Sequence, residues 1–105
     1  MRNLFRLCHA TIALFVTASA ALSQEYPNRP IHLIVPYPAG GATDVVARVV
    51  AEKMSEDLGQ QVIIDNRPGA GTMIGASAVA RSPADGYTLL IGDTATYALN
   101  PTLYD

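Results

Sequence analysis

The sequence has 105 residues, a single cysteine, no tryptophan and a formal net charge of −2 at neutral pH. A chain of this length forms one domain at most. Its acidic balance disfavours binding to nucleic acid, which requires a basic surface. The first 23 residues differ sharply in composition from the rest, because every glycine, proline and tyrosine lies after residue 25. The two parts are therefore interpreted separately.

Residues 1–23 have the organisation of a secretory signal peptide. Two arginines and no acidic residue accompany an apolar run at residues 10–22, and small residues that suit signal peptidase stand at 18–20 and 21–23. A membrane anchor is the alternative, but a span needs about 20 apolar residues and this run is shorter. We expect export, cleavage near residues 20–25 and no stable membrane insertion after cleavage.

The chain from residue 24 onward holds five basic and nine acidic residues, one histidine (His32) and no cysteine. This composition excludes a disulfide and disfavours a zinc-type metal site, since nitrogen and sulfur ligands are scarce. We expect no metal and no cofactor. Exported domains of this size usually depend on such cross-links for stability. Their absence suggests that residues 24–105 belong to a larger fold.

Three short apolar runs predict β-strands at residues 30–36, 61–66 and 87–92. Their nearly continuous apolar character is typical of strands that are buried on both faces of a parallel sheet. His32, near the start of the first run, is interpreted as a strand residue without a functional role.

The first helix is predicted at about residues 43–58, with Thr43 or Asp44 as the N-cap and Gly59 as its exit. An apolar stripe is expected to lie on the sheet. The stripe consists of Val46, Val50 and Met54, widened by Val45 and Val49.

A second helix is predicted at about residues 72–81, where glycine and alanine predominate and allow close approach to the sheet. Residues 93–105 are expected to form a loop with one helical turn around Pro101.

The element order β-α-β-α-β predicts an α/β fold. Helical crossovers require parallel strands and are right-handed almost without exception. The most economical arrangement is one half of a doubly wound parallel sheet with strand order 2-1-3, which is incomplete as it stands.

In open α/β sheets, ligands bind at the carboxyl ends of the strands where the strand order reverses. The loops at that point are residues 36–44 and 92–97. In the first loop, Gly40 and Gly41 permit a tight turn, and free N–H groups of Gly41, Ala42 and Thr43 would suit an anion at the helix N-terminus. A purely structural turn with its own caps explains the same residues equally well.

The second loop offers a cluster of polar side chains that could hydrogen-bond a ligand carboxylate or hydroxyl. The cluster consists of Asp93, Thr94, Thr96 and Tyr97. A solvated loop with ordinary caps explains these residues nearly as well.

Recognised enzyme signatures are absent from the sequence. It has no Gly-x-Ser-x-Gly elbow, no Gly-Lys-Ser/Thr phosphate loop and no Cys/His pair. The glycines at 69, 71 and 75 approximate a dinucleotide fingerprint, but their spacing is one residue too long and Arg67-Pro68 intervenes.

Several blocks of the sequence, in order, resemble the extracytoplasmic solute receptors of tripartite tricarboxylate transporters, the Bug-type or TctC-like periplasmic binding proteins. The blocks are Tyr26-Pro27, Pro30-Ile31, residues 35–44, residues 65–71, residues 74–76, residues 85–89, Asn100-Pro101 and Leu103-Tyr104. Thr72-Met73 and residues 92–96 depart from the commoner family pattern.

The resemblance implies a periplasmic receptor with two α/β lobes that close on a small carboxylate and deliver it to membrane permease subunits. It implies that residues 24–105 are the N-terminal part of lobe 1, with the second lobe absent. The resemblance implies that the ligand carboxylate is held mainly by backbone N–H groups and waters in the loop at residues 37–44, with help from the other lobe. The predicted ligand-binding residues are Tyr37, Ala39, Gly40, Gly41, Ala42, Thr43, Asp44, Thr94 and Thr96.

The leading hypothesis is therefore a non-enzymatic receptor for di- or tricarboxylates or related organic anions, truncated to one lobe and for that reason expected to bind weakly. One alternative is a small exported enzyme acting on an anionic substrate, for which Asp44 and Asp93 are the nearest carboxylates. The other alternative is a non-functional truncated gene product.

Overall fold

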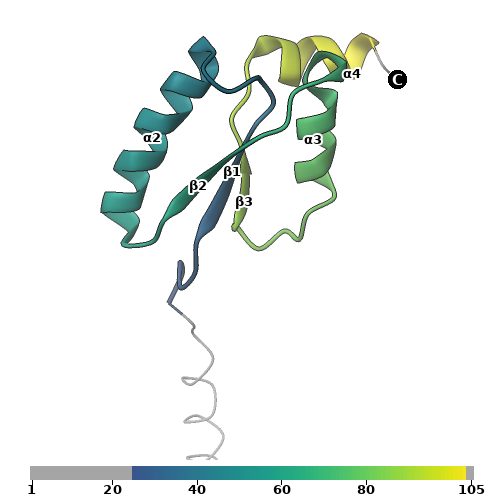
Figure 1. Ribbon diagram of the computed structural model, residues 1–105. Coiled ribbons are helices and arrows are strands. Elements are labelled where there is room, and N and C mark those ends of the chain that lie inside the picture. The colour runs from purple at the N-terminus through teal and green to yellow at the C-terminus, as the bar shows by residue number, and fades with distance from the viewer. Residues whose placement is uncertain (1–24, 104–105) are drawn as a thin grey trace, which may run out of the picture.

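The computed structural model describes residues 25–103 (Figure 1). The predicted signal peptide at residues 1–23 lies outside them. The elements are β1 (Ile31–Val35), α2 (Ala42–Leu58), β2 (Val62–Asn66), the short 3₁₀ turn η2 (Ala70–Thr72), α3 (Met73–Ala80), β3 (Thr88–Leu90), the π-helical turn η3 (Ala95–Leu99) and α4 (Asn100–Leu103). Among residues 25–103, no helix has the length and apolar character needed to cross a membrane.

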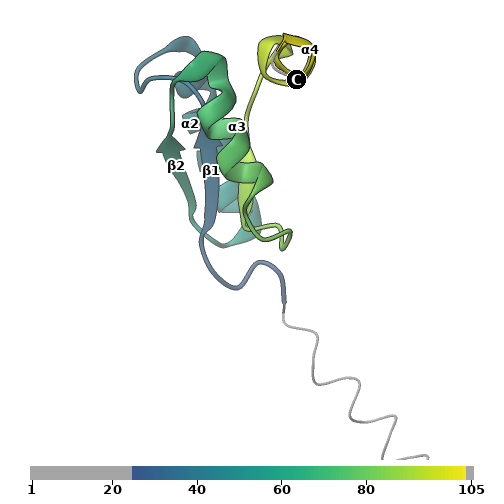
Figure 2. The same cartoon turned by 90° about the vertical axis from the view of Figure 1, so that its right-hand side faces the viewer.

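The three strands form one parallel sheet in the order β2-β1-β3, which confirms the predicted α/β fold and strand order. Leu33 of β1 is paired with Ile64 on one side and Leu89 on the other. The connection through α2 moves in one direction along the sheet, and the connection through α3 returns across β1. Because both crossovers are expected to be right-handed, the two helices belong on opposite faces, and Figure 2 shows them there.

The core lies between the sheet and α2, and it is built on the central strand. Ile31, Leu33 and Val35 of β1 point to one face and are almost fully buried against Ala47 and Ala51 of the helix. A strand flanked on both sides by other strands and covered by a helix loses most of its contact with water, which explains why every residue of β1 except the exposed His32 is apolar.

The face that α2 turns toward the sheet is not the predicted valine stripe. Its fully buried residues are Asp44, Ala47 and Ala51. The four predicted valines are 40–64% exposed, and they are Val45, Val46, Val49 and Val50. Met54, the remaining member of the predicted stripe, does pack against the core. Alanine side chains let the helix backbone come close to the large residues of β1, so small rather than bulky residues mark the buried face.

The N-terminus of α2 differs from the prediction, and its C-terminus agrees with it. The N-cap is Gly41, which makes no side-chain capping hydrogen bond, and neither Thr43 nor Asp44 occupies that position. The predicted exit is confirmed, because Gly59 has a φ of 66° and its N–H donates to the carbonyl of Ser55.

The second helix approaches the sheet as closely as its small residues predict. A Cβ atom added at Gly75 would lie only 2.8 Å from Cβ of Pro36 at the end of β1. The helix therefore has no room for a larger residue at this point.

The segment after β3 is more ordered than predicted. Instead of a loop with one turn, residues 95–103 form η3 followed directly by α4 (Figure 1). The carboxylate of Asp93 accepts a hydrogen bond from the N–H of Thr96 at 3.1 Å, and this starts the helical turn as a side-chain cap does. The π-helical turn η3, which is wider than an α-helix, lies just before Pro101. Proline has no N–H to donate, so it interrupts the regular α-helical hydrogen bonds.

The corrected face of α2 can be tested by introducing the same residue at a buried and an exposed position. Ala47→Leu should lower the free energy of unfolding by about 1–3 kcal/mol, because the larger side chain meets β1. Val49→Leu, at a site that is 64% exposed, should change it by less than about 0.5 kcal/mol. Urea unfolding followed by circular dichroism measures both, and a larger loss for Val49→Leu would contradict the observed packing.

Candidate functional site

The site predicted from topology is the edge of the sheet where the parallel strands end. Three loops lie there, after β1, after β2 and after β3, together with the N-terminus of α2 (Figure 1). The strand order reverses between β1 and β3, so the first and third of these loops flank the position where open α/β sheets bind ligands.

The loop after β1 turns sharply into α2 at two glycines. Gly40 has a φ of +85°, a left-handed conformation that residues with a side chain rarely adopt. Its N–H donates to Oδ2 of Asp44 at 2.9 Å, and the N–H of Gly41 donates to the carbonyl of Pro38 at 3.3 Å. The expectation of a free N–H at Gly41 is therefore wrong. The N–H groups of Ala42 and Thr43 lie in the first turn and have no acceptor within the helix.

Asp44 is a buried carboxylate that holds this loop in place. Its side chain is almost inaccessible to water, and three groups donate to it. Arg48 Nε lies 2.8 Å from Oδ2, the N–H of Gly40 lies 2.9 Å from the same oxygen, and Asn66 Nδ2 lies 2.9 Å from Oδ1. The hydrogen bond from Arg48, followed by those from Gly40 and Asn66, lowers the pKa of Asp44 to about 2 against the opposing effect of burial.

Asn66, at the end of β2, was not singled out by the sequence analysis. Its Nδ2 donates to Oδ1 of Asp44 and, at 3.1 Å, to the carbonyl of Tyr37. Asn66 is paired with Val35, the last residue of β1, and this register places its amide beside the first loop. The signal that the sequence offered for Asn66 was a polar residue at the end of an apolar strand. Arg48 was likewise not singled out; its side chain is 56% exposed, and its Nε is bonded to Asp44.

The loop after β3 is tied to the loop after β1 through Asp93. Tyr37 donates its hydroxyl to Oδ2 of Asp93 at 2.5 Å. Thr96 donates its N–H and its hydroxyl to Oδ1, at 3.1 and 3.3 Å. The hydrogen bond from Tyr37 is the main cause that lowers the pKa of Asp93, and the same bond raises the pKa of Tyr37. Asp93 is therefore charged and Tyr37 neutral at physiological pH.

The predicted site residues thus divide into three groups by burial. Thr96 is buried with its hydroxyl on Asp93, and Asp44 is buried within its own network. Ala39, Gly40, Gly41, Ala42 and Thr94 are exposed, and Tyr37 and Thr43 are half-buried.

The loop after β2 has an unusual backbone. Four consecutive residues have positive φ angles: 122° at Gly69, 48° at Ala70, 59° at Gly71 and 79° at Thr72. A β-branched residue is strained in this region. Thr72 is held there by Asn100, whose Nδ2 donates to its Oγ1 at 2.9 Å and to the carbonyl of Gly71 at 2.5 Å.

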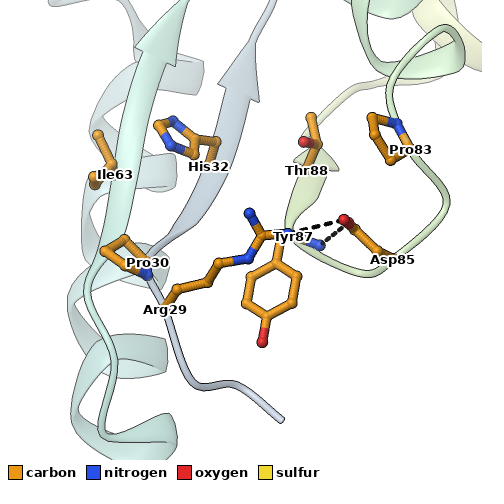
Figure 3. A pocket seen from close by; sticks show the side chains of 8 residues that line it. All are labelled: Arg29, Pro30, His32, Ile63, Pro83, Asp85, Tyr87 and Thr88. Carbon is orange, nitrogen blue, oxygen red and sulfur yellow. Dashed lines mark hydrogen bonds and ion pairs between the residues drawn. The ribbon is translucent and has the colours of Figure 1, made fainter. Parts of the chain in front are cut away.

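A cavity of about 380 Å³ lies at the opposite edge of the sheet, near the start of the strands (Figure 3). Arg29 crosses it, with its guanidinium carbon 4.1 Å from the centre of the Tyr87 ring and one nitrogen 2.9 Å from the carboxylate of Asp85. Tyr26 packs edge-on against Tyr87 with ring centres 5.0 Å apart. These contacts join the segment before β1 to the segment before β3, so the polar groups here serve the fold.

Within residues 25–103, no group of three or more histidine, cysteine or acidic side chains is placed to hold a metal ion. Between the loops after β1 and β3, the accessible groups are backbone donors, hydroxyls and the charged carboxylate of Asp93, since the carboxylate of Asp44 is buried.

This α/β arrangement is similar to part of the fold of solved periplasmic binding proteins. The solved structure of the periplasmic binding protein BugD aligns with a TM-score of 0.60 and 51% identity, over 62% of this chain and 22% of that one. MatC from Rhodopseudomonas palustris, solved with bound malate, aligns with a TM-score of 0.72 and 38% identity, over 76% of this chain and 27% of its own.

The family described as the tripartite tricarboxylate transporter family receptor matches residues 46–105. BugT of Bordetella pertussis is 48% identical over 96 residues. The chain belongs to this receptor family, as its sequence blocks predicted. The match covers 88% of this chain and 29% of BugT, so the chain spans less than a third of the length of that relative.

The Asp44 network should give the fold a characteristic dependence on pH. A carboxyl group whose pKa is lowered on folding stabilises the fold above its ordinary value of 3.8, and this contribution is lost as the pH falls toward about 2. Asp44→Asn should lower stability at neutral pH and weaken the pH dependence of the urea midpoint between pH 4 and pH 2. Asp57→Asn, at an exposed residue of α2, is the matched control and should leave that dependence in place.

The support that Asn100 gives to the strained loop can be tested by removing its amide. Asn100→Ala leaves the buried hydroxyl of Thr72 and the carbonyl of Gly71 without their donor, and should lower the free energy of unfolding by about 1–3 kcal/mol. Thr102→Ala, at an exposed neighbour, should change it by less than about 0.5 kcal/mol. Equal effects of the two changes in chemical denaturation would contradict the role assigned to Asn100.

Proposed function

We propose that the chain is the N-terminal part of lobe 1 of an exported periplasmic receptor, which captures small carboxylates for a tripartite tricarboxylate transporter. Its partners are then a di- or tricarboxylate, or a related organic anion, and the membrane permease subunits of the transporter. Membership of the receptor family supports the class of function, and MatC, 38% identical over the aligned part, was solved with bound malate.

The observation that carries the proposal is the first turn of α2. The N–H groups of Ala42 and Thr43 have no acceptor within the helix, and they follow directly on the Gly40-Gly41 turn. A helix N-terminus carries roughly half a unit of positive charge together with unsatisfied donors, which suits a carboxylate. The ligand-binding residues we propose remain Tyr37, Ala39, Gly40, Gly41, Ala42, Thr43, Asp44, Thr94 and Thr96, with Asp44 acting through the loop that it holds.

Binding by residues 24–105 alone is expected to be weak. The described loops form one wall of a ligand site, and in a receptor with two lobes the second lobe supplies the opposing wall. A ligand held on one side keeps much of its contact with water, and fewer contacts then offset the entropy that it loses on binding. A dissociation constant in the millimolar range is the expected result for succinate.

The enzyme alternative receives no support from the site geometry. Asp44 accepts hydrogen bonds from three donors and has a pKa of about 2, so it is a poor general base at neutral pH. The hydrogen bond from Tyr37 also lowers the pKa of Asp93. The family is one of solute receptors, which agrees with a binding function.

The proposed anion site can be tested by deleting a single backbone donor. Ala42 is the first residue of α2, a position where proline is well tolerated, and Gly41 before it has the extended backbone that proline requires. Ala42→Pro removes one N–H and should weaken succinate binding about tenfold, since a hydrogen bond to a charged group contributes about 1.5–3 kcal/mol. Amide shifts in ¹⁵N NMR titrations report millimolar binding.

Ala42→Ser is the matched control, because it changes the same residue and keeps its N–H. It should bind succinate as the unmodified chain does. Unchanged affinity in a folded Ala42→Pro variant would remove the first turn of α2 from the site, and no binding of succinate or malate by the unmodified chain would overturn the proposed function.

A further inference from the structure

The acceptor groups of the candidate site gather around Asp93, on the side of the sheet where β3 ends. Oδ1 of Asp93 accepts the N–H and the hydroxyl of Thr96, while Oδ2 accepts a single hydrogen bond, from Tyr37. A carboxylate oxygen can accept two hydrogen bonds, so Oδ2 keeps the capacity for one more.

Asp93 differs from the other aspartates that the structure describes. Each of the other four is within 3.2 Å of a lysine or arginine nitrogen, in the pairs Asp44–Arg48, Asp57–Lys53, Asp65–Arg67 and Asp85–Arg29. Among the ion pairs of residues 25–103, none includes Asp93. Only neutral groups donate to it, so its negative charge is not neutralised by a neighbouring cation.

Tyr37 adds to the acceptor character of this side. Its hydroxyl proton is directed to Asp93, which leaves the phenolic oxygen with lone pairs and no second proton to donate. The two flanking loops thus differ in polarity. The first turn of α2 offers N–H donors, and the loop after β3 offers the acceptors of Asp93 and Tyr37.

A ligand lying between these loops would face N–H donors on one side and hydrogen-bond acceptors on the other. A second carboxylate near Asp93 is repelled, since like charges in contact interact unfavourably, and more strongly at a protein surface than in bulk water. A hydroxyl or ammonium group in the same place donates to Oδ2. Such a difference discriminates between ligands, because it penalises one group and favours another at the same position.

We propose that Asp93 makes this site selective for small carboxylates that carry a hydrogen-bond donor, a hydroxyl or an ammonium group, over plain dicarboxylates of the same length. This inference rests on the proposed carboxylate-binding function and deepens it. Asp93 acts as a specificity-determining residue, and Tyr37 and Thr96 fix its orientation.

The test compares succinate, malate and aspartate, which share a four-carbon dicarboxylate skeleton and carry hydrogen, hydroxyl or ammonium at one carbon. Each is titrated at neutral pH into the ¹⁵N-labelled protein, and the amide shifts of Ala42, Thr43 and Thr96 are followed. We expect aspartate and malate to bind about tenfold more tightly than succinate, the lower end of the range for a charge-assisted hydrogen bond.

Asp93→Asn removes the charge while keeping a side-chain oxygen that can accept the N–H of Thr96. It should reduce the preference to about twofold or less and raise the affinity for succinate. Asp93→Ser, another capping residue, provides a second variant with the same expected result. Asp57→Asn removes an equal charge from the exposed end of α2 and should leave the preference at about tenfold.

Two kinds of result would overturn the inference. Equal affinities for the three ligands in the unmodified protein, or a preference that survives in both Asp93 variants, would show that Asp93 does not select the ligand while leaving carboxylate binding intact. Failure of all three ligands to bind would instead overturn the proposed function, and the inference with it.

Discussion

The candidate site depends on one buried carboxylate. Asp44 receives donors from three different parts of the chain: the N–H of Gly40 in the first loop, the guanidinium of Arg48 one helical turn later, and the amide of Asn66 at the end of β2. A buried charge is costly without such partners. Because all three donors must converge on the same two oxygens, Asp44 fixes the direction of the first loop relative to both α2 and the sheet.

Fixing the loop also determines which backbone donors remain for a ligand. The contacts that shape the turn use the N–H groups of Gly40 and Gly41, and the N–H groups of Ala42 and Thr43 in the first turn of α2 have no acceptor within the helix. Tyr37 extends the same unit, since its carbonyl accepts from Asn66 and its hydroxyl donates to Asp93 in the loop after β3. The flanking loops are thereby held by one another before any ligand binds, which reduces the ordering cost of binding.

The fold could be predicted largely from the sequence, and the contacts of the site could not. Apolar runs and right-handed crossovers determine the parallel sheet and its order, and this topology predicts the edge at which a ligand would bind. The buried face of α2 was misassigned because close packing on β1 selects Ala47 and Ala51 over larger valines nearby. Asn66 and Asp44 are 22 residues apart, and Tyr37 and Asp93 are 56 apart. No local pattern indicates such pairs, since they depend on strand register and loop direction.

The proposed binding of an anion is compatible with the acidic net charge of the chain. The chain from residue 24 onward has five basic and nine acidic residues, so its overall charge opposes the approach of a carboxylate. At physiological ionic strength, however, the interaction between exposed charges is screened over about 8 Å. In the proposed site, the nearest groups to a ligand at the first turn of α2 are the N–H donors of that turn, and the loop after β3 adds the acceptor Asp93. On this proposal, the local arrangement of donors and acceptors, rather than the net charge, would decide whether a carboxylate binds and which substituent beside it is accepted.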